Sequence, residues 1–149
     1  MSVQFDGIDD LMSTIENLGN IGTRAGKKAI QSGCKIVLEQ MKKDAPKDDG
    51  DSILPSQNAA HGAEFLDLQE IKLRPNYVYG AVGIGSKNWE QTKQFWFQHY
   101  GFEDMGLNFR GKPFIKKHTG WVYKSREKCG DKAEDEVIKV LLQEINKIW

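Results

Sequence analysis

Residues 21–46, IGTRAGKKAIQSGCKIVLEQMKKDAP, contain the strongest structural signal in this sequence. Apolar residues recur there at intervals of three and four, which is the spacing of one helix face. That stripe comprises Ile30, Cys34, Val37, Leu38, Met41 and Ala45. Pro46 disfavours helical geometry at Ala45 and ends the helix there. We therefore expect a helix over about residues 21–44, long enough at about 1.5 Å per residue to cross a small sheet.

The segments that flank this helix differ in character. Residues 8–18 predict a short amphipathic helix within an N-terminal arm, residues 1–19. Residues 46–64 contain two prolines and two glycines, which predicts a long mobile loop. Two apolar runs, residues 65–73 and 77–84, then predict an antiparallel hairpin. One slip in the alternation of the first run indicates a bulge.

The second half of the chain completes the predicted fold. Residues 89–97 indicate either a short helix or an irregular aromatic segment. A terminal helix is expected over about residues 119–148, with a break near Gly130 as an alternative. Its second half places five aliphatic residues on one face: Val137, Ile138, Leu141, Ile145 and Ile148. The order predicts one α+β domain over residues 1–149, with a small antiparallel sheet packed against the long helix of the N-terminal half and the C-terminal helix.

Opposite charges cancel in this chain but are not mixed evenly. It has 21 basic and 21 acidic side chains and a formal net charge of zero. Residues 1–19 and 48–70 contain acids and no bases, whereas residues 20–47 and 71–130 are strongly basic. The zero total excludes a globally basic nucleic-acid coat, and blocks of opposite sign favour contact between copies of the chain. Acidic loops beside basic ones within one monomer are the alternative.

Catalytic and metal-binding patterns are absent from the sequence. The three histidines are His61, His99 and His118, and none has a ligand at metal-site spacing on a continuous helix. We interpret His99 as a hydrogen-bonded structural residue. No Gly-x-Ser-x-Gly elbow or phosphate-binding loop occurs, and the glycines from Gly80 to Gly85 are interpreted as sites of close backbone packing. The acidic run after Pro46 lacks calcium-loop spacing. We expect no enzyme, no cofactor and no bound metal.

The cellular compartment follows from the cysteines and the hydropathy. Cys34 and Cys129 lie far apart and form no CxxC motif. No secretory signal and no membrane-spanning apolar run is evident. These features predict a soluble protein made in a reducing cytoplasm, with both thiols free.

Residues 110–128 are the best candidate for contact with nucleic acid. Seven bases lie there with one acid, Glu127. Four aromatic residues lie beside or between these bases: Phe109, Phe114, Trp121 and Tyr123. Basic side chains neutralise phosphates and aromatic rings stack on unpaired nucleobases. The interpretation we favour is a solvated helix start whose aromatic rings belong to the core.

The order of short motifs resembles the neck or tail-completion proteins of long-tailed bacteriophages. The matching elements, in order, are Phe5-Asp6-Gly7-Ile8-Asp9-Asp10-Leu11 with Leu18-Gly19, Lys42-Lys43-Asp44-Ala45-Pro46 with Gly50, Val82-Gly83-Ile84-Gly85, Trp96-Phe97-Gln98-His99-Tyr100-Gly101, and Lys112-Pro113-Phe114-Ile115. The resemblance covers nearly the whole chain. His99 stands where the family usually has Glu, and Phe102 where it has Thr.

This resemblance implies a structural protein rather than an enzyme. It implies a homo-oligomeric ring, with six subunits as the expected number, that joins the head to the tail around the DNA channel. The implied partners are further copies of the chain, the head-closure and tail-terminator proteins, and DNA in transit. The implied location is the neck of the virion, after assembly in the host cytoplasm. The alternatives are a tail terminator, a nucleic-acid-binding module that uses residues 110–128, and a small hydrolase.

Charged residues of the predicted loop and helices are the candidate contact sites between subunits or with the channel lumen. From the loop and the long helix they are Lys47, Asp48, Asp49, Asp51, Lys27, Lys35 and Lys42. Lys116 and Lys117, from the basic segment, complete the set. A ring requires complementary surfaces on each subunit, and opposite charges supply such complementarity.

Overall fold

The computed structural model describes residues 2–3, 20–46, 62–74, 77–103, 114–115 and 118–147. The helix predicted over residues 8–18 lies outside these residues, as do positions 47–61 of the predicted loop. Residues 62–65, at the end of that loop, form a 3-10 helix, η1 (Gly62–Phe65).

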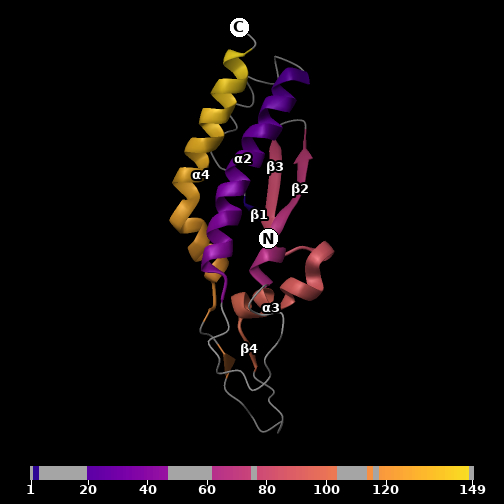
Figure 1. The fold of residues 1–149 in the computed structure, drawn as a ribbon, viewed down its shortest axis with the longest axis vertical. Coiled ribbons are helices and arrows are strands. Elements are labelled where there is room, and N and C mark those ends of the chain that lie inside the picture. Colours follow the sequence, from indigo (N-terminus) through magenta and orange to yellow (C-terminus); the bar gives the residue numbers. More distant parts are fainter. Residues whose placement is uncertain are drawn as a thin grey trace.

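Helix α2 (Asn20–Asp44) is the central element of the fold, as the sequence predicts. It contacts the strands β2 (Asp67–Leu73) and β3 (Val78–Gly83) on one side and helix α4 (Trp121–Asn146) on another (Figure 1). Five residues of the predicted stripe are buried and Leu38 is partly buried. Lys42 and Lys43 lie in the last turn, where positive charge interacts favourably with the helix dipole and stabilises the helix. The 3.6-residue period of the sequence therefore places α2 correctly.

The sheet has three antiparallel strands in the order β1-β3-β2. The strands are β1 (Ser2–Val3), β2 (Asp67–Leu73) and β3 (Val78–Gly83). The predicted hairpin is β2–β3, and its register shifts between Leu68 and Ile71, which is the predicted bulge. The sequence does not predict the pairing of Ser2 with Ala81, because a two-residue strand has no readable period.

Helix α4 (Trp121–Asn146) packs along α2 in the opposite direction. It is continuous through Gly130, so the alternative of a break there is wrong. The Lys28 amine lies 2.8 Å from Glu144, and the Lys128 amine lies 2.9 Å from Asp44. Hydrogen bonds from Lys147 and Lys28 lower the pKa of Glu144. The pairs Lys28–Glu144 and Lys128–Asp44 join each end of α2 to the opposite end of α4.

The prediction of which α4 residues form its apolar face is only partly confirmed. Val137 and Leu141 are buried and Ile145 is partly buried. Ile138, however, is 43% exposed, because it lies one residue beyond the stripe that faces α2. Ile148 lies outside the described residues.

A third helix, α3 (Trp89–Tyr100), lies at the end of the molecule where α2 ends and α4 begins. The 3-10 helix η2 (Ser86–Asn88) precedes it. Gly101 follows α3 with a φ of 83°, a backbone conformation that glycine adopts more readily than other residues. The chain then enters β4 (Phe102–Glu103), which pairs with β5 (Phe114–Ile115). The aromatic segment is therefore helical, and the α+β class is confirmed.

Candidate interaction surfaces

An exposed group of aromatic rings covers the outer side of α3 and the first turn of α4. We call it the aromatic face, and it comprises Trp89, Trp96, Phe97, Tyr100 and Tyr123. Each of these side chains is between 38% and 58% exposed. The centroid of the Trp96 ring lies 6.2 Å from that of Trp89, 5.5 Å from that of Phe97 and 4.6 Å from that of Tyr100. A contiguous exposed group of this kind is typical of a site for protein–protein contact.

Buried side chains beneath the aromatic face fix its position. The ring of Phe95 packs edge-on against that of Trp121, with 5.8 Å between centroids. The Trp121 indole N–H also donates a 3.0 Å hydrogen bond to the Phe95 carbonyl. The Thr92 hydroxyl donates to the Asn88 carbonyl at 2.7 Å. The Phe95–Trp121 contacts attach α3 to the start of α4, and the Thr92 bond stabilises the first turn of α3, so the exposed rings lie on a supported helix.

His99 connects the aromatic face to the core. Its imidazole is 2% exposed, and its ring centroid lies 4.7 Å from those of Tyr100 and of Tyr123. The Val122 backbone N–H donates to His99 Nδ1 at 3.4 Å, and the Gly120 N–H donates to the His99 carbonyl. His99 is therefore a buried, hydrogen-bonded structural residue, in agreement with the interpretation from sequence.

The stability of the protein should fall as the pH drops below about 6.5 because of His99. Burial lowers the pKa of His99, so the unfolded chain binds the proton more readily than the folded protein does. Stability from the neutral imidazole is present above the unfolded pKa and is lost as the pH falls through the folded one. We expect the denaturant midpoint to fall between pH 7 and pH 5, and to fall less in His99→Gln. An equal fall in both proteins would contradict this assignment.

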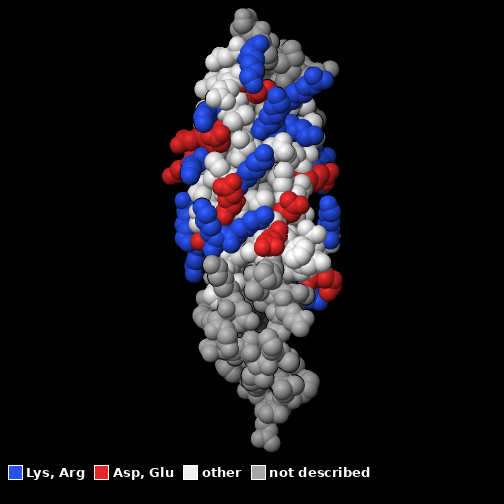
Figure 2. Space-filling view, viewed as in Figure 1, with Lys and Arg blue, Asp and Glu red and all other residues white. Residues whose placement is uncertain are grey.

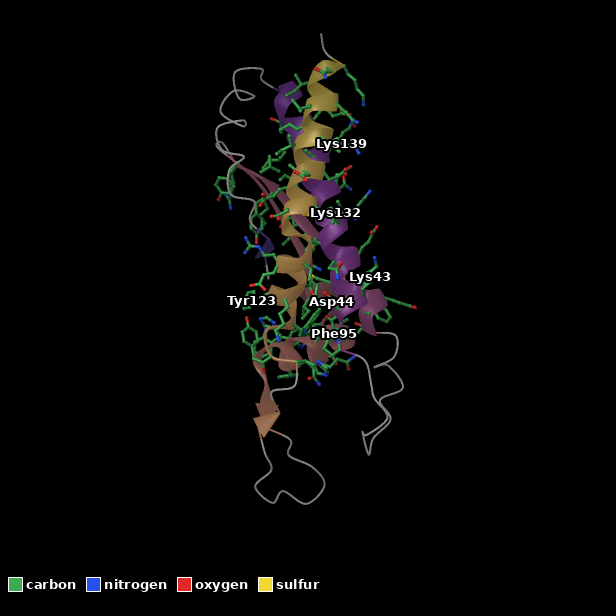
Figure 3. The ribbon with its side chains drawn as sticks, turned by 90° about the vertical axis from the view of Figure 1, so that its left-hand side faces the viewer. Lys43, Asp44, Phe95, Tyr123, Lys132 and Lys139 are labelled. Carbon is green, nitrogen blue, oxygen red and sulfur yellow. The ribbon has the colours of Figure 1, made fainter. Side chains whose placement is uncertain are left out.

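Asp44 forms a polar junction between α2 and α4 (Figure 3). It receives hydrogen bonds from Gln40 at 2.9 Å and from Lys128 at 2.9 Å, and its Oδ2 atom lies 3.0 Å from the Ser125 hydroxyl. The hydroxyl has one proton and also lies 3.0 Å from the Trp121 carbonyl, so it donates to one acceptor at a time. Burial raises the pKa of Asp44, but the hydrogen bonds outweigh it and leave the pKa below its usual value.

The predicted contact residues divide into two groups. Lys27, Lys35 and Lys42 lie on α2 away from the core, where basic side chains follow the helix across the molecule (Figure 2). The others lie outside the described residues: Lys47, Asp48, Asp49, Asp51, Lys116 and Lys117. The structure therefore locates only the α2 part of the predicted set.

The basic segment 110–128 does not display all of its aromatic residues. Trp121 is buried against Phe95, whereas Tyr123 is 58% exposed. Phe109 lies outside the described residues, and nothing is described of the side chain of Phe114. Burial of Trp121 agrees with the interpretation of this segment as a helix start whose aromatic rings belong to the core, whereas the exposure of Tyr123 shows that this interpretation is wrong for that ring.

The thiols are free, and burial makes them unreactive. Cys34 and Cys129 form no disulfide, and both are buried. Burial raises the pKa of Cys34 to about 11, and burial together with the charge of Asp44 raises that of Cys129. Within the described residues, no group of three or more His, Cys, Asp or Glu side chains is placed to hold a metal ion. The helices there are also too short or too polar to cross a membrane.

Sequence reasoning misses the aromatic face, although a signal exists. Trp89, Trp96 and Tyr100 recur at spacings of seven and four, which places them on one side of a helix. Three other residues of α3 recur at three and four on the other side, and all are buried: Thr92, Phe95 and His99. Because the sequence leaves residues 89–97 as either a helix or an irregular segment, it does not separate the two sides.

Comparison with known proteins does not place the chain in a family. No family model, no curated protein and no solved structure matches this sequence.

Proposed function

We propose that this protein is a structural subunit of a bacteriophage head–tail connector, a neck or tail-completion protein. In this proposal its copies form a ring around the DNA channel, between the head-closure and tail-terminator proteins. The aromatic face is the surface through which the subunit binds a neighbouring protein of the connector. The protein acts by assembly rather than by catalysis.

The aromatic face is the observation that supports assembly most directly. Trp and Tyr are enriched among the residues that dominate protein–protein binding energies, because each buries a large rigid surface. Here four exposed rings lie on a helix that Phe95 and Trp121 attach to the core. The aromatic face is therefore a preformed surface, and binding it costs little ordering entropy.

Three of the five motifs that resemble the phage family lie, apart from Gly50, in the described residues, and each coincides with the end of a structural element. Ala45-Pro46 follows the last residue of α2. Val82-Gly83-Ile84-Gly85 ends β3, and Tyr100-Gly101 ends α3. Motifs at element boundaries specify how the chain turns, and the proposal takes their colinear order as its link to the phage family. A tail terminator with the same kind of fold remains the alternative role, and the order of neighbouring genes distinguishes the two.

The proposal predicts that the protein lies at the head–tail joint of purified virions. Disruption of its gene should give filled heads and separate tails, which electron microscopy of the lysate would show. Complementation with the wild-type gene should restore joined particles. The double variant Trp96→Ser/Phe97→Ser should restore few or none, because it removes two rings from the aromatic face.

Tyr77→Ser is the matched control, since Tyr77 is 48% exposed but lies before β3, outside the aromatic face. It should complement as well as the wild type. Absence of the protein from the head–tail joint would reject the proposed function. Equal complementation by both variants would reject the role of the aromatic face.

A further inference from the structure

One side of α2 carries a row of basic side chains that lie outside the hydrophobic core. We call it the α2 ridge, and it comprises Arg24, Lys28, Lys35 and Lys42. Lys28, Lys35 and Lys42 recur every seven residues, which keeps them on one side of the helix. Arg24, Lys28 and Lys35 are exposed and Lys42 is half-buried.

Most of the α2 ridge forms no ion pair with the residues that the structure describes. Lys28 pairs with Glu144 of α4 at 2.8 Å, so the ridge borders α4 at that point. Within the described residues, no ion pair engages Arg24, Lys35 or Lys42. An exposed acid, Glu39, lies one turn beyond Lys35 at the edge of the row and offsets part of its charge. The α2 ridge thus keeps a positive surface that faces solvent.

Helix α4 has an outer face of different chemistry. We call it the α4 outer face, and it comprises Glu127, Asp131, Asp135, Ile138 and Leu142. The three acids recur every four residues and are exposed, and the two aliphatic residues continue the row at 43% and 48% exposure. In the part of the chain that the structure describes, no ion pair engages these three carboxylates. Within that part of the chain, the α4 outer face thus combines negative charge without an ion pair and exposed apolar surface.

The basic side chains beside the α4 outer face do not cancel its charge fully. Lys128 reaches back to Asp44 at 2.9 Å, and Lys139 pairs with Glu136 at 3.2 Å. Figure 3 labels Lys132 and Lys139 on α4. Lys128 and Lys139 are therefore already engaged in ion pairs within the subunit.

We propose that the α2 ridge of one copy binds the α4 outer face of the next copy. The inference rests on the proposed ring and names the surfaces that form it. Opposite charge orients the two copies, and Ile138 and Leu142 pack against Leu38 and the aliphatic stems of the lysines. Because the two surfaces differ, every copy offers one of each, and repetition of such a contact closes into a ring when the rotation permits.

Duplex DNA is the other occupant that the α2 ridge could accept, because a row of lysines also neutralises phosphates. DNA would leave the α4 outer face uncovered and would be repelled by its carboxylates. A contact between two copies, in contrast, covers the α2 ridge of one copy and the α4 outer face of the other. The charge complementarity therefore favours self-association.

Reciprocal charge reversal tests the contact. Sedimentation velocity on the full chain at low salt should show association that increases with protein concentration and weakens at high salt. Lys35→Glu alone and Asp131→Lys alone should each weaken it about tenfold or more. The chain that contains both reversals should associate like the wild type, since an acidic position 35 would then face a basic position 131. An equimolar mixture of the two single variants should associate for the same reason.

Lys87→Glu is the matched control, because Lys87 is exposed on η2 and lies on neither surface. It should associate like the wild type, and thermal melts should confirm that all variants fold. A monomer at every concentration up to about 1 mM at low salt would overturn the contact. Failure of the double reversal to restore association would overturn it too.

Further outcomes distinguish this contact from DNA binding and from the proposed function. Binding of a fluorescent duplex DNA that Lys35→Glu abolishes, without association between copies, would assign the α2 ridge to DNA and overturn the proposal. If neither charge reversal changes the association between copies, the proposed contact is overturned but the proposed ring is not. Conversely, reciprocal rescue in a protein that is absent from the virion neck would support the contact and reject the proposed function.

Discussion

Replacing Trp121 by alanine should destabilise the protein by about 3–5 kcal/mol, the usual cost of deleting a large buried aromatic side chain. Trp121 is 5% exposed and packs against Phe95. Its removal also leaves the Phe95 carbonyl without the indole hydrogen bond. Urea unfolding followed by circular dichroism should show the lower midpoint.

The matched control is Tyr123→Ala, two residues further along the same helix. Tyr123 is 58% exposed and its ring contact is with His99, so its truncation should change the free energy of unfolding by only about 0.5–1.5 kcal/mol. Equal destabilisation by the two variants would contradict the division into a buried support and an exposed aromatic face.

Replacing Gly80 by valine should destabilise the protein by about 1–3 kcal/mol through overpacking. A Cβ atom at this position would lie 2.6 Å from Cys34 Sγ and 2.8 Å from Ile30 Cγ2, both on buried side chains of α2. The sheet and α2 would have to move apart, because a packed core has no free volume to accept the side chain. Chemical denaturation at fixed pH measures the loss.

Ala81→Val is the control for strand propensity, since Ala81 neighbours Gly80 and points to the other side of the sheet. It should be nearly neutral. Adding Cys34→Ala to Gly80→Val should recover part of the lost stability, because it removes the nearest clashing atom. A Gly80→Val variant as stable as Ala81→Val would show that α2 and β3 are not in close contact.

The sequence locates best those elements whose periodic pattern repeats over several turns and whose ends carry a residue that stops the element. The stripe from Ile30 to Ala45 repeats over four turns and stops at Pro46, so the sequence predicts the end of α2 at the observed residue. The bulge in β2 follows from a single slip in alternation. The close-packing role assigned to the strand glycines agrees with the contact between Gly80 and α2.

The short pairings and the surfaces are harder to predict. β1, β4 and β5 have two residues each, too few for a period. Spacing alone puts Ile138 with the apolar stripe, yet the side of α4 that meets α2 excludes it. Which apolar residues stay exposed depends on where the neighbouring helix lies.

By itself, the sequence determined the α+β class, the long basic helix, the hairpin with its bulge, and two free thiols. Only the tertiary structure decided that Trp121 supports the core while Trp96 and Tyr123 are exposed. It also decided which charges are paired: Lys28 meets Glu144 and Lys128 meets Asp44, whereas the rest of the α2 ridge and the acids of the α4 outer face have no ion pair within the described residues. The reason is that periodicity defines the faces of a helix, whereas contacts between residues distant in sequence decide what covers each face.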